Sequence, residues 1–351
     1  MDIAYLLNLS VEKKASDLHL TPGSPPILRI DGDLIAVEGA PILDATLTKN
    51  LVYSVMDNDE QQAFESSLEL DFAIISPKGD ARFRVNAYHE SRGVAAAFRV
   101  ITTKIPTLEE LGAPAVFKEL LKLSSGLILV VGPTGCGKST TLAACIEFIN
   151  QNDARHIITI EDPIEYIYES KKSLINQRQV YRDSAAFSTA LHAALREDPD
   201  VILVGEMRDL ETIRLALTAA ETGHLVLGTL HTMSAPRAVS RIVDIFPSGG
   251  EKNIIRNMLS ESLQAVISQT LLKANAGGRI AAYEIMLGSP AIRNLIREDK
   301  ISQMYSVIQT SSDIGMCTME QSLNDLVLRN IVTDEECRNS GAKRQLFEKT
   351  V

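Results

Sequence analysis

The 351-residue chain is predicted to be an α/β protein, in which a small α+β domain precedes a larger domain built on a mostly parallel sheet. Its length favours two domains. From Ser125 onward, short β-branched runs alternate with segments of helical spacing, as in βαβ units. The first of these runs leads directly into a glycine-rich loop and then a helix. The residues before Ser125 instead combine helical segments with strands of alternating polarity.

The N-terminal domain is expected over residues 1–101. Its predicted helices cover Ile3–Lys14 and Thr48–Phe64. Extended segments are expected at 16–20 and 27–30, and the second of them runs into a hairpin turn at Asp31-Gly32-Asp33. Two further strands are predicted at Arg82–Tyr88 and Val94–Val100. In the first, Arg82 and Arg84 share one face, and Arg99 lies opposite Phe98 in the second, so one sheet can present several guanidinium groups.

The connection between the domains is expected at 102–123, with a short helix inside it, and the second domain at 124–351. Its strands are predicted at 127–131, 156–160, 201–204 and 225–230. Leu142 to Ile149 and Phe187 to Ala194 follow helical spacing. From about Glu251 the pattern is helical, and the predicted helices are Ile254–Leu272, Ala291–Arg297, Thr318–Arg329 and Thr333 to the end.

Composition narrows the possible functions. The net charge of −10 disfavours a nucleic-acid partner. None of the four cysteines forms a Cys-x-x-Cys pair, which fits free thiols in a reducing cytoplasm. The N-terminus does not resemble a signal peptide, and no apolar run reaches the ~18 residues of a membrane span. We therefore expect a cytoplasmic protein that meets any membrane partner from that side.

The glycine-rich loop carries the strongest functional signal. It is the complete G-x-x-x-x-G-K-[ST] pattern in strand–loop–helix context, and its residues are Gly132, Pro133, Thr134, Gly135, Cys136, Gly137, Lys138, Ser139 and Thr140. Backbone N–H groups of such a loop and the helix N-terminus bind phosphate. Lys138 is predicted to reach the β- and γ-phosphates and Ser139 to coordinate Mg²⁺. The sequence thus predicts a Mg²⁺-dependent ATPase.

Acidic residues and histidines follow other predicted strands, where the carboxyl ends of parallel strands form the ligand edge. Glu206 follows a wholly apolar strand and is predicted to polarise the attacking water. Glu161 is the second choice for that role and a candidate metal ligand, with Asp162 in support. His231 emerges at the same edge, where it can sense the γ-phosphate or hold a carboxylate. His224 lies at the opposite strand end and could face a neighbouring subunit's site.

At this point the chain resembles the secretion and type IV pilus ATPases. An Asp box at Ile158–Tyr166, a Walker B segment at Asp200–Asp209 and a His box at Thr222–Thr232 follow the phosphate loop in that order. The N-terminal Ala15–Leu20 also resembles the family. Ala291–Glu298 resembles the C-terminal signature of the pilus-retraction members, although an ordinary amphipathic helix would give the same stripe. Assembly and type II secretion members usually carry a tetracysteine motif, which this sequence lacks.

The resemblance implies a PAS-like N-terminal domain, a RecA-like ATPase domain with a helical C-terminal part, and a homohexameric ring. It also implies that Arg82, Arg84 and Arg99 approach the phosphates, and that the partners are the pilus machinery, its inner-membrane platform protein and a possible second retraction ATPase. Cys136 departs from the usual serine, and its thiol could sensitise the loop to alkylation. An assembly or secretion motor, or a weakly hydrolysing accessory subunit, remain alternatives to a retraction motor.

Overall fold

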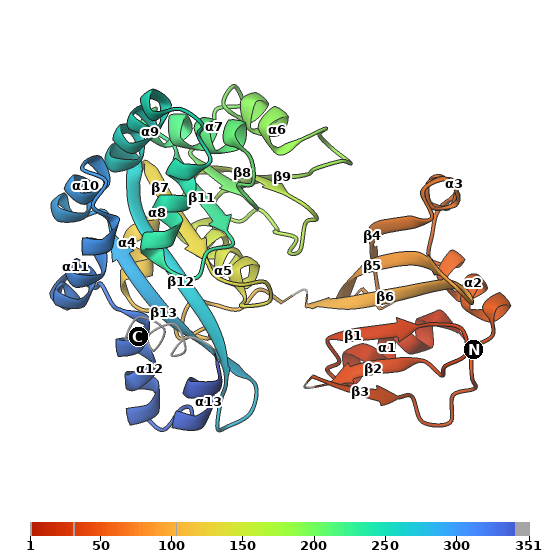
Figure 1. The fold of residues 1–351 in the computed structure, drawn as a ribbon. Helices are drawn as coiled ribbons and strands as arrows, with labels where there is room; N and C mark the ends of the chain where they lie inside the picture. The colour runs from red at the N-terminus through yellow and green to blue at the C-terminus, as the bar shows by residue number, and fades with distance from the viewer. Residues whose placement is uncertain (1, 31, 77, 80, 103, 341–351) are drawn as a thin grey trace. The chain divides into compact units, whose positions relative to one another are not determined.

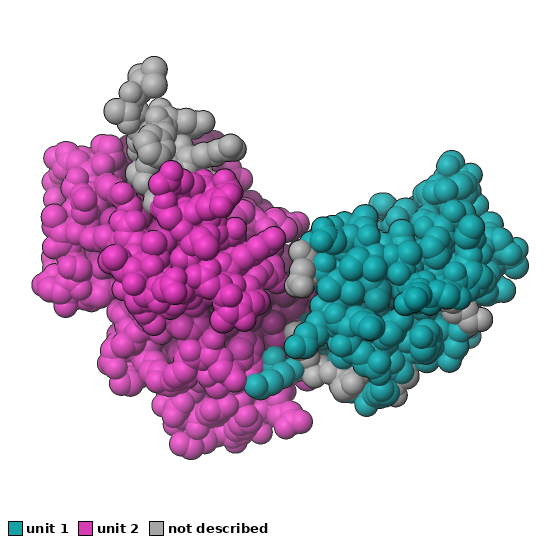
Figure 2. All heavy atoms as spheres, turned by 90° about the horizontal axis from the view of Figure 1, so that it is seen from below, with its two compact units in different colours: residues 1–104 teal, residues 105–351 magenta. Residues whose placement is uncertain are grey.

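The computed structural model describes residues 2–30, 32–76, 78–79, 81–102 and 104–340 (Figure 1). The chain divides into two compact units, residues 1–104 and 105–351, which Figure 2 colours separately. The segment 105–123, assigned above to the connection, belongs to unit 2. The reason is hydrophobic: Phe117 and Leu121 of helix α4 (Val116–Leu121) are buried in the core of that unit.

Unit 1 contains an antiparallel sheet of six strands in the order β3-β2-β1-β6-β5-β4. Its core gathers Phe64, Phe83 and Phe98, which are fully buried. The strands are β1 (Asp17–Leu20), β2 (Ile27–Ile30), β3 (Asp33–Ala36), β4 (Glu69–Ile75), β5 (Ala81–Glu90) and β6 (Gly93–Thr102), and the helices are α1 (Ile3–Glu12), α2 (Ala45–Tyr53) and α3 (Asn58–Ser67). The predicted strands of this unit are confirmed, whereas Asp31 of the predicted turn lies outside the described residues.

The helical region predicted over Thr48–Phe64 consists of two helices, α2 and α3. A capping box starts the second one: Asp57 accepts from the Glu60 amide at 2.8 Å, and the Glu60 carboxylate accepts from the Asp57 amide at 3.0 Å. This exchange satisfies two backbone donors that a continuous helix would bond internally, and so fixes a helix start at this point.

Unit 2 is built on a seven-stranded sheet in the order β13-β12-β7-β11-β10-β8-β9, in which only the β12–β13 pair is antiparallel. The four predicted strands are confirmed as β7 (Gly126–Val131), β8 (His156–Glu161), β10 (Val201–Val204) and β11 (Leu225–Leu230). Sequence patterns missed β9 (Leu174–Gln179) and β13 (Arg279–Leu287). The predicted fold class, an α/β chain with an α+β N-terminal part, is confirmed.

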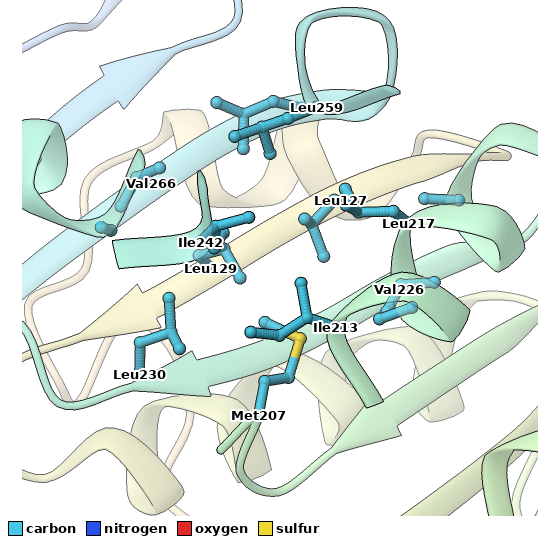
Figure 3. Close-up of a cluster of buried hydrophobic side chains, with 14 of the residues drawn as sticks. Leu127, Leu129, Met207, Ile213, Leu217, Val226, Leu230, Ile242, Leu259 and Val266 are labelled. Atoms are coloured by element: carbon cyan, nitrogen blue, oxygen red, sulfur yellow. The ribbon is translucent and has the colours of Figure 1, made fainter. Parts of the chain in front are cut away.

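Helices cover both faces of this sheet. Helix α4 and helix α5 (Lys138–Asn152) pack on one face, and the other face carries helices from α6 to α11. Figure 3 shows that second core, where side chains of α7, α8 and α9 meet those of β7, β11 and β12. The helices of this face are α6 (Phe187–Ala194), α7 (Leu210–Glu221), α8 (Ala235–Asp244), α9 (Gly249–Ser262), α10 (Pro290–Arg297) and α11 (Met304–Thr310).

The predicted helix Ile254–Leu272 is wrong over its second half. Helix α9 ends at Ser262, and β12 (Leu263–Lys273) pairs with both β7 and β13. Residues 263–273 mix apolar residues with Gln264, Ser268 and Gln269 and show no strict alternation, so periodicity cannot tell this buried strand from a helix. The predicted helices at 291–297 and 318–329 are confirmed as α10 and α12 (Met319–Leu328). Helix α13 spans Asp334–Asn339, and residues 341–351 of the last predicted helix lie outside the described residues.

Candidate functional site

The glycine-rich loop joins β7 to the 15-residue helix α5. Gly132 is in the left-handed region with φ +147°, and a Cβ there would lie 2.5 Å from the Gln269 backbone oxygen and 2.6 Å from Cys136 Sγ. A side chain is therefore excluded at this position. Gly135 (φ +79°) faces open space, with nothing within 4 Å of where a Cβ would be. The loop is thus closed on its inner side and open at Gly135, at a helix N-terminus that favours phosphate.

Lys138 lies inside this loop, with a side chain that is 9% exposed. Its ammonium donates to the carbonyls of Gly132, at 2.9 Å, and Pro133, at 3.1 Å. Burial lowers the pKa of Lys138, and the opposing influences come from Cys136, Glu206 and Glu165. Two carboxylates therefore act on the loop ammonium. One of them, Glu165, lies within the Asp box and was not among the predicted site residues.

The first turn of α5 is tied to the segment that follows β8. Ser139 and Thr140 are half-buried there, and Thr140 Oγ1 lies 3.0 Å from the hydroxyl of Tyr166. The carbonyl of Tyr166 in turn accepts from Gln177 Nε2 at 2.8 Å. These contacts hold the Asp box beside the phosphate loop. They explain how Glu165, one residue before Tyr166, comes to act on Lys138.

The surroundings of Cys136 disfavour the thiol reactivity that the sequence suggested. Its side chain is 4% exposed, and burial raises its pKa although Lys138 opposes the shift. Because the thiolate is the reactive form, alkylation of Cys136 is disfavoured in the folded protein.

Glu161 is buried at the end of β8. Its Oε1 accepts from Thr159 Oγ1 at 2.7 Å, and Gln177 Nε2 lies 3.5 Å away. Burial raises the pKa of Glu161 to about 7, against the effect of these hydrogen bonds. A group of this pKa exchanges protons near neutral pH, whereas Mg²⁺ prefers ionised carboxylates. Burial thus favours the protonated form of Glu161 in the metal-free protein, and its role as a metal ligand stays a prediction.

Stability should therefore depend on pH through Glu161. The folded-state pKa is raised from 4.5 to about 7, so the folded protein retains a proton that the unfolded chain loses. The free energy of unfolding then falls as pH rises from about 4.5 to 7, by up to about 3 kcal/mol. Glu161→Gln keeps an acceptor for Thr159 and removes this loss. We expect its melting temperature at pH 8 to exceed that of the unsubstituted protein by about 5 °C or more, and the gap to close near pH 5. Glu169→Gln, an exposed change, is the control, and an equal response of both variants would contradict the prediction.

Glu206 follows β10 and is held from two sides. Arg208 Nε lies 2.5 Å from Oε1, and His231 Nε2 lies 3.1 Å from the same oxygen. Burial by itself would raise the pKa of Glu206, but the hydrogen bond from Arg208 and the charge of His231 outweigh it and lower the pKa. Glu206 is therefore ionised and oriented at the same sheet edge as the phosphate loop. His231 thus contacts a carboxylate, as one of its two predicted roles requires, and the sensing of the γ-phosphate stays a prediction.

The loop after His231 is anchored on the β12–β13 hairpin. Ser268 Oγ donates to the Met233 carbonyl at 3.3 Å, and the buried Glu284 accepts from the Ala235 amide at 2.8 Å. His224 lies at the other end of β11, where its Nδ1 is 2.9 Å from the carbonyl of Ala219 in α7. Within the described residues His224 therefore serves to close a helix end, and it is far along the strand from His231.

A cavity of about 580 Å³ adjoins the phosphate loop within unit 2. Its lining combines Pro133, Thr134, Gly135 and Cys136 of the loop with Thr270 to Lys273, Arg237, Arg279, Glu284 and Tyr305. Its volume is within the range of small-molecule sites.

The three predicted arginines lie together in unit 1. Arg84 of β5 and Arg99 of β6 are direct partners in the sheet register, and Arg82 is two residues from Arg84 on the same face. Arg84 pairs with Asp71 at 3.4 Å and Arg99 with Asp17 at 3.0 Å. The arginine face predicted from the alternating pattern is therefore present, with two of its members held by carboxylates of the same unit.

Helix α10 contains the stretch that resembles the retraction signature. Ile292 and Ile296 are fully buried, as an amphipathic stripe requires. Arg293 of the same helix is half-buried. Its guanidinium donates at 2.5 Å to the carbonyls of Ser260 and Glu261 at the end of α9. A cation at a helix C-terminus satisfies orphan carbonyls and interacts favourably with the helix dipole.

Arg293→Ala should therefore act on stability. It leaves the carbonyls at the end of α9 without their donor, at a cost of about 2–4 kcal/mol in the free energy of unfolding. The neighbouring Arg297→Ala is the matched control, because its pair with Glu261 is exposed and contributes about 0–1 kcal/mol. Urea unfolding of both variants measures the difference. Equal losses would show that the helix-end contacts of Arg293 add nothing.

Both the sequence and the structure of this chain are similar to those of known proteins. The family model described as "Type II/IV secretion system protein" matches residues 2–338. The type IV pilus retraction ATPase PilT of Pseudomonas aeruginosa is 56% identical over 96% of this chain and 97% of its own length. A twitching motility protein of Neisseria gonorrhoeae is 54% identical over 89% of this chain and 83% of its own length. The crystal structure of the pilus retraction motor PilT with bound ADP superposes with a TM-score of 0.88 at 48% identity, covering 97% of both chains.

Among the described residues, no helix combines the length and apolarity that a membrane span requires.

Proposed function

Since the chain belongs to the type II/IV secretion system protein family, we propose that it is a hexameric motor ATPase that powers retraction of type IV pili. The observation that carries the hydrolytic part is the phosphate loop, whose buried Lys138 lies under the influence of Glu206 and Glu165. The retraction part is supported by 56% identity to PilT over nearly the whole of both chains.

The proposed chemistry uses the site as it stands. The ATP phosphates lie on the loop amides from Gly132 to Thr140, and Lys138 exchanges its loop carbonyls for phosphate oxygens. Glu206, ionised and oriented by His231, accepts a hydrogen bond from the attacking water and directs it toward the γ-phosphate. Glu165, in the Asp box, provides a second carboxyl group that acts on Lys138. Glu161, buried at the end of β8, exchanges protons near neutral pH.

Magnesium fits this site through its hard oxygen donors. Ser139 offers a half-buried hydroxyl on the first turn of α5, and the side chains of Glu206 and Glu165 offer oxygen atoms for hydrated contacts. When bound, the ion neutralises charge that develops on the phosphates. Glu161 remains proposed as a further ligand only in its ionised form.

The arginine face of unit 1 is proposed to act in the assembled ring. Arg82, Arg84 and Arg99 would stabilise the charge of the transferring phosphoryl group. The ion pairs of Arg84 and Arg99 keep both guanidinium groups oriented on one sheet face until a phosphate competes with Asp71 or Asp17. His224 is proposed to face a neighbouring subunit in the same assembly.

The proposed place of action is the cytoplasmic face of the inner membrane, against the pilus platform protein and, in some cells, beside a second retraction ATPase. The proposal excludes nucleic acid, because the net charge of −10 repels it. Hydrolysis is proposed to be intrinsic, since the loop lysine and the Glu206–His231 pair are both in place.

The test is ATPase activity of the purified protein together with its elution from a sizing column in the presence of Mg-ATP. The proposal expects a hexamer that turns over ATP. A protein that binds ATP but elutes as a monomer and turns over no ATP would contradict it and support an accessory role.

A further inference from the structure

Strand β12 lies beside the phosphate loop, and Gln269 is its residue at that point. Parallel pairing sets Ser268 against Val131, the last residue of β7, so Gln269 continues beside Gly132. The Gln269 side chain is 1% exposed. Its Nε2 donates to the carbonyl of Cys136 at 2.6 Å, across 133 residues of sequence. From these contacts we infer that Gln269 is a positioning residue that sets the conformation of the phosphate loop for nucleotide binding.

Gln269 holds the loop at two places. Its backbone oxygen packs where a side chain on Gly132 would be, at the start of the loop, and its amide binds Cys136 near the end. Between these points lie the amides that face the open side at Gly135. Loop amides bind phosphate only when several N–H groups converge, so fixing both ends of the loop fixes that convergence.

The hydrogen bonds of the Gln269 side chain indicate why this position carries an amide and not an apolar group. Only the NH₂ group can donate to a carbonyl, so the contact with Cys136 fixes the orientation of the amide. Its Oε1 is then buried and has no hydrogen-bond partner within the described part of the chain. An apolar side chain would fill this space without that cost. Within the described residues, the side-chain hydrogen bond of Gln269 is therefore the one that its NH₂ group donates to the phosphate loop.

The two faces of β12 serve different loops. Ser268 points to the loop after His231 through the Met233 carbonyl, and its neighbour Gln269 points to the phosphate loop. The hairpin β12–β13 therefore connects both loops of the proposed site, and β13 runs on into α10 through 288–289. The positioning role of Gln269 rests on the proposed nucleotide site.

The test measures the Kd of a fluorescent ATP analogue in the presence of Mg²⁺. The sequence contains no tryptophan, so tryptophan fluorescence does not interfere with this measurement. Gln269→Leu should raise that Kd about tenfold, which corresponds to about 1.4 kcal/mol. Its melting temperature without nucleotide should change little, because the variant loses the bond to Cys136 but also loses the unpaired Oε1. Gln264→Leu is the matched control on the same strand. Gln264 contacts Ser125 and Arg293 rather than the loop, so its Kd should be unchanged.

A second variant, Gln269→Glu, gives a pH-dependent Kd that would not be expected if Gln269 had only a structural role. A protonated carboxyl can donate to the Cys136 carbonyl, whereas the ionised form repels both that carbonyl and the phosphates. The ratio of its Kd to that of the unsubstituted protein should therefore fall severalfold as pH is lowered from about 9 to 6, while the ratio for Gln269→Leu stays constant.

Equal Kd values for the unsubstituted protein and both Gln269 variants would overturn the inference while leaving the proposed function standing. The inference would also be overturned if the rise in Kd were matched by a loss of stability, measured as a lowered melting temperature. Failure of the unsubstituted protein to bind the analogue would instead contradict the proposed function itself.

Discussion

Glu206→Gln is expected to lower kcat for ATP hydrolysis by about 100-fold or more, with the Kd for ATP changed by no more than about threefold. Glu206 is the ionised carboxylate at the sheet edge, held by Arg208 and His231. Glutamine keeps its size and can still bond both neighbours, but it cannot accept a proton or polarise water as a carboxylate does. General-base groups typically contribute 10²–10⁴-fold.

Two companion variants sharpen this result. Glu165→Gln removes the second carboxylate that acts on Lys138, and we expect a loss in kcat there as well. Glu169→Gln changes an exposed glutamate of the same segment and should have no effect. Single-turnover hydrolysis separates the chemical step from product release. A Glu206→Gln protein with undiminished single-turnover rate would rule out the assigned role.

Lys138→Ala is expected to weaken ATP binding about 100-fold, and hydrolysis at ordinary ATP concentrations should then be lost. The ammonium is the buried cation of the loop, and charge-assisted hydrogen bonds to phosphate are among the strongest in proteins. The substitution also leaves the carbonyls of Gly132 and Pro133 without their donor, which disfavours the approach of phosphate.

The control for this variant is Lys122→Ala, which removes an exposed lysine whose ammonium pairs with Glu119. Equilibrium binding of a fluorescent ATP analogue measures both proteins. Unchanged affinity in Lys138→Ala would show that the loop amides alone bind the nucleotide.

Much of the fold and site could be predicted because the relevant signals are local. The phosphate loop, its strand and its helix are adjacent in sequence, and a buried parallel strand followed by a carboxylate at Glu206 is readable without a structure. The pairing of His231 with Glu206 follows from the shared ligand edge of neighbouring strands.

What the sequence missed depends on contacts between distant segments. Gln269 lies in an apolar run that reads equally well as helix, and its partner is Cys136, 133 residues away. Glu165 is distinguished from Glu161 only by the fold: Tyr166 binds Thr140 beside the loop, whereas Glu161 turns back toward Thr159. The contacts of Arg293 could not be predicted because its partners are backbone carbonyls of another helix, which no residue pattern reveals.

The most direct test of the central claim is pilus retraction in living cells. In a bacterium whose own retraction ATPase has been deleted, shortening of labelled pili is followed after expression of this protein or of Glu206→Gln. We predict that the unsubstituted protein restores shortening and that Glu206→Gln, at equal abundance, does not. If both proteins restored retraction equally, retraction would not depend on ATP hydrolysis by this protein. If neither restored it while ATP hydrolysis is intact, the hydrolysis would not drive retraction. Either result would contradict the assignment of the protein as a retraction motor.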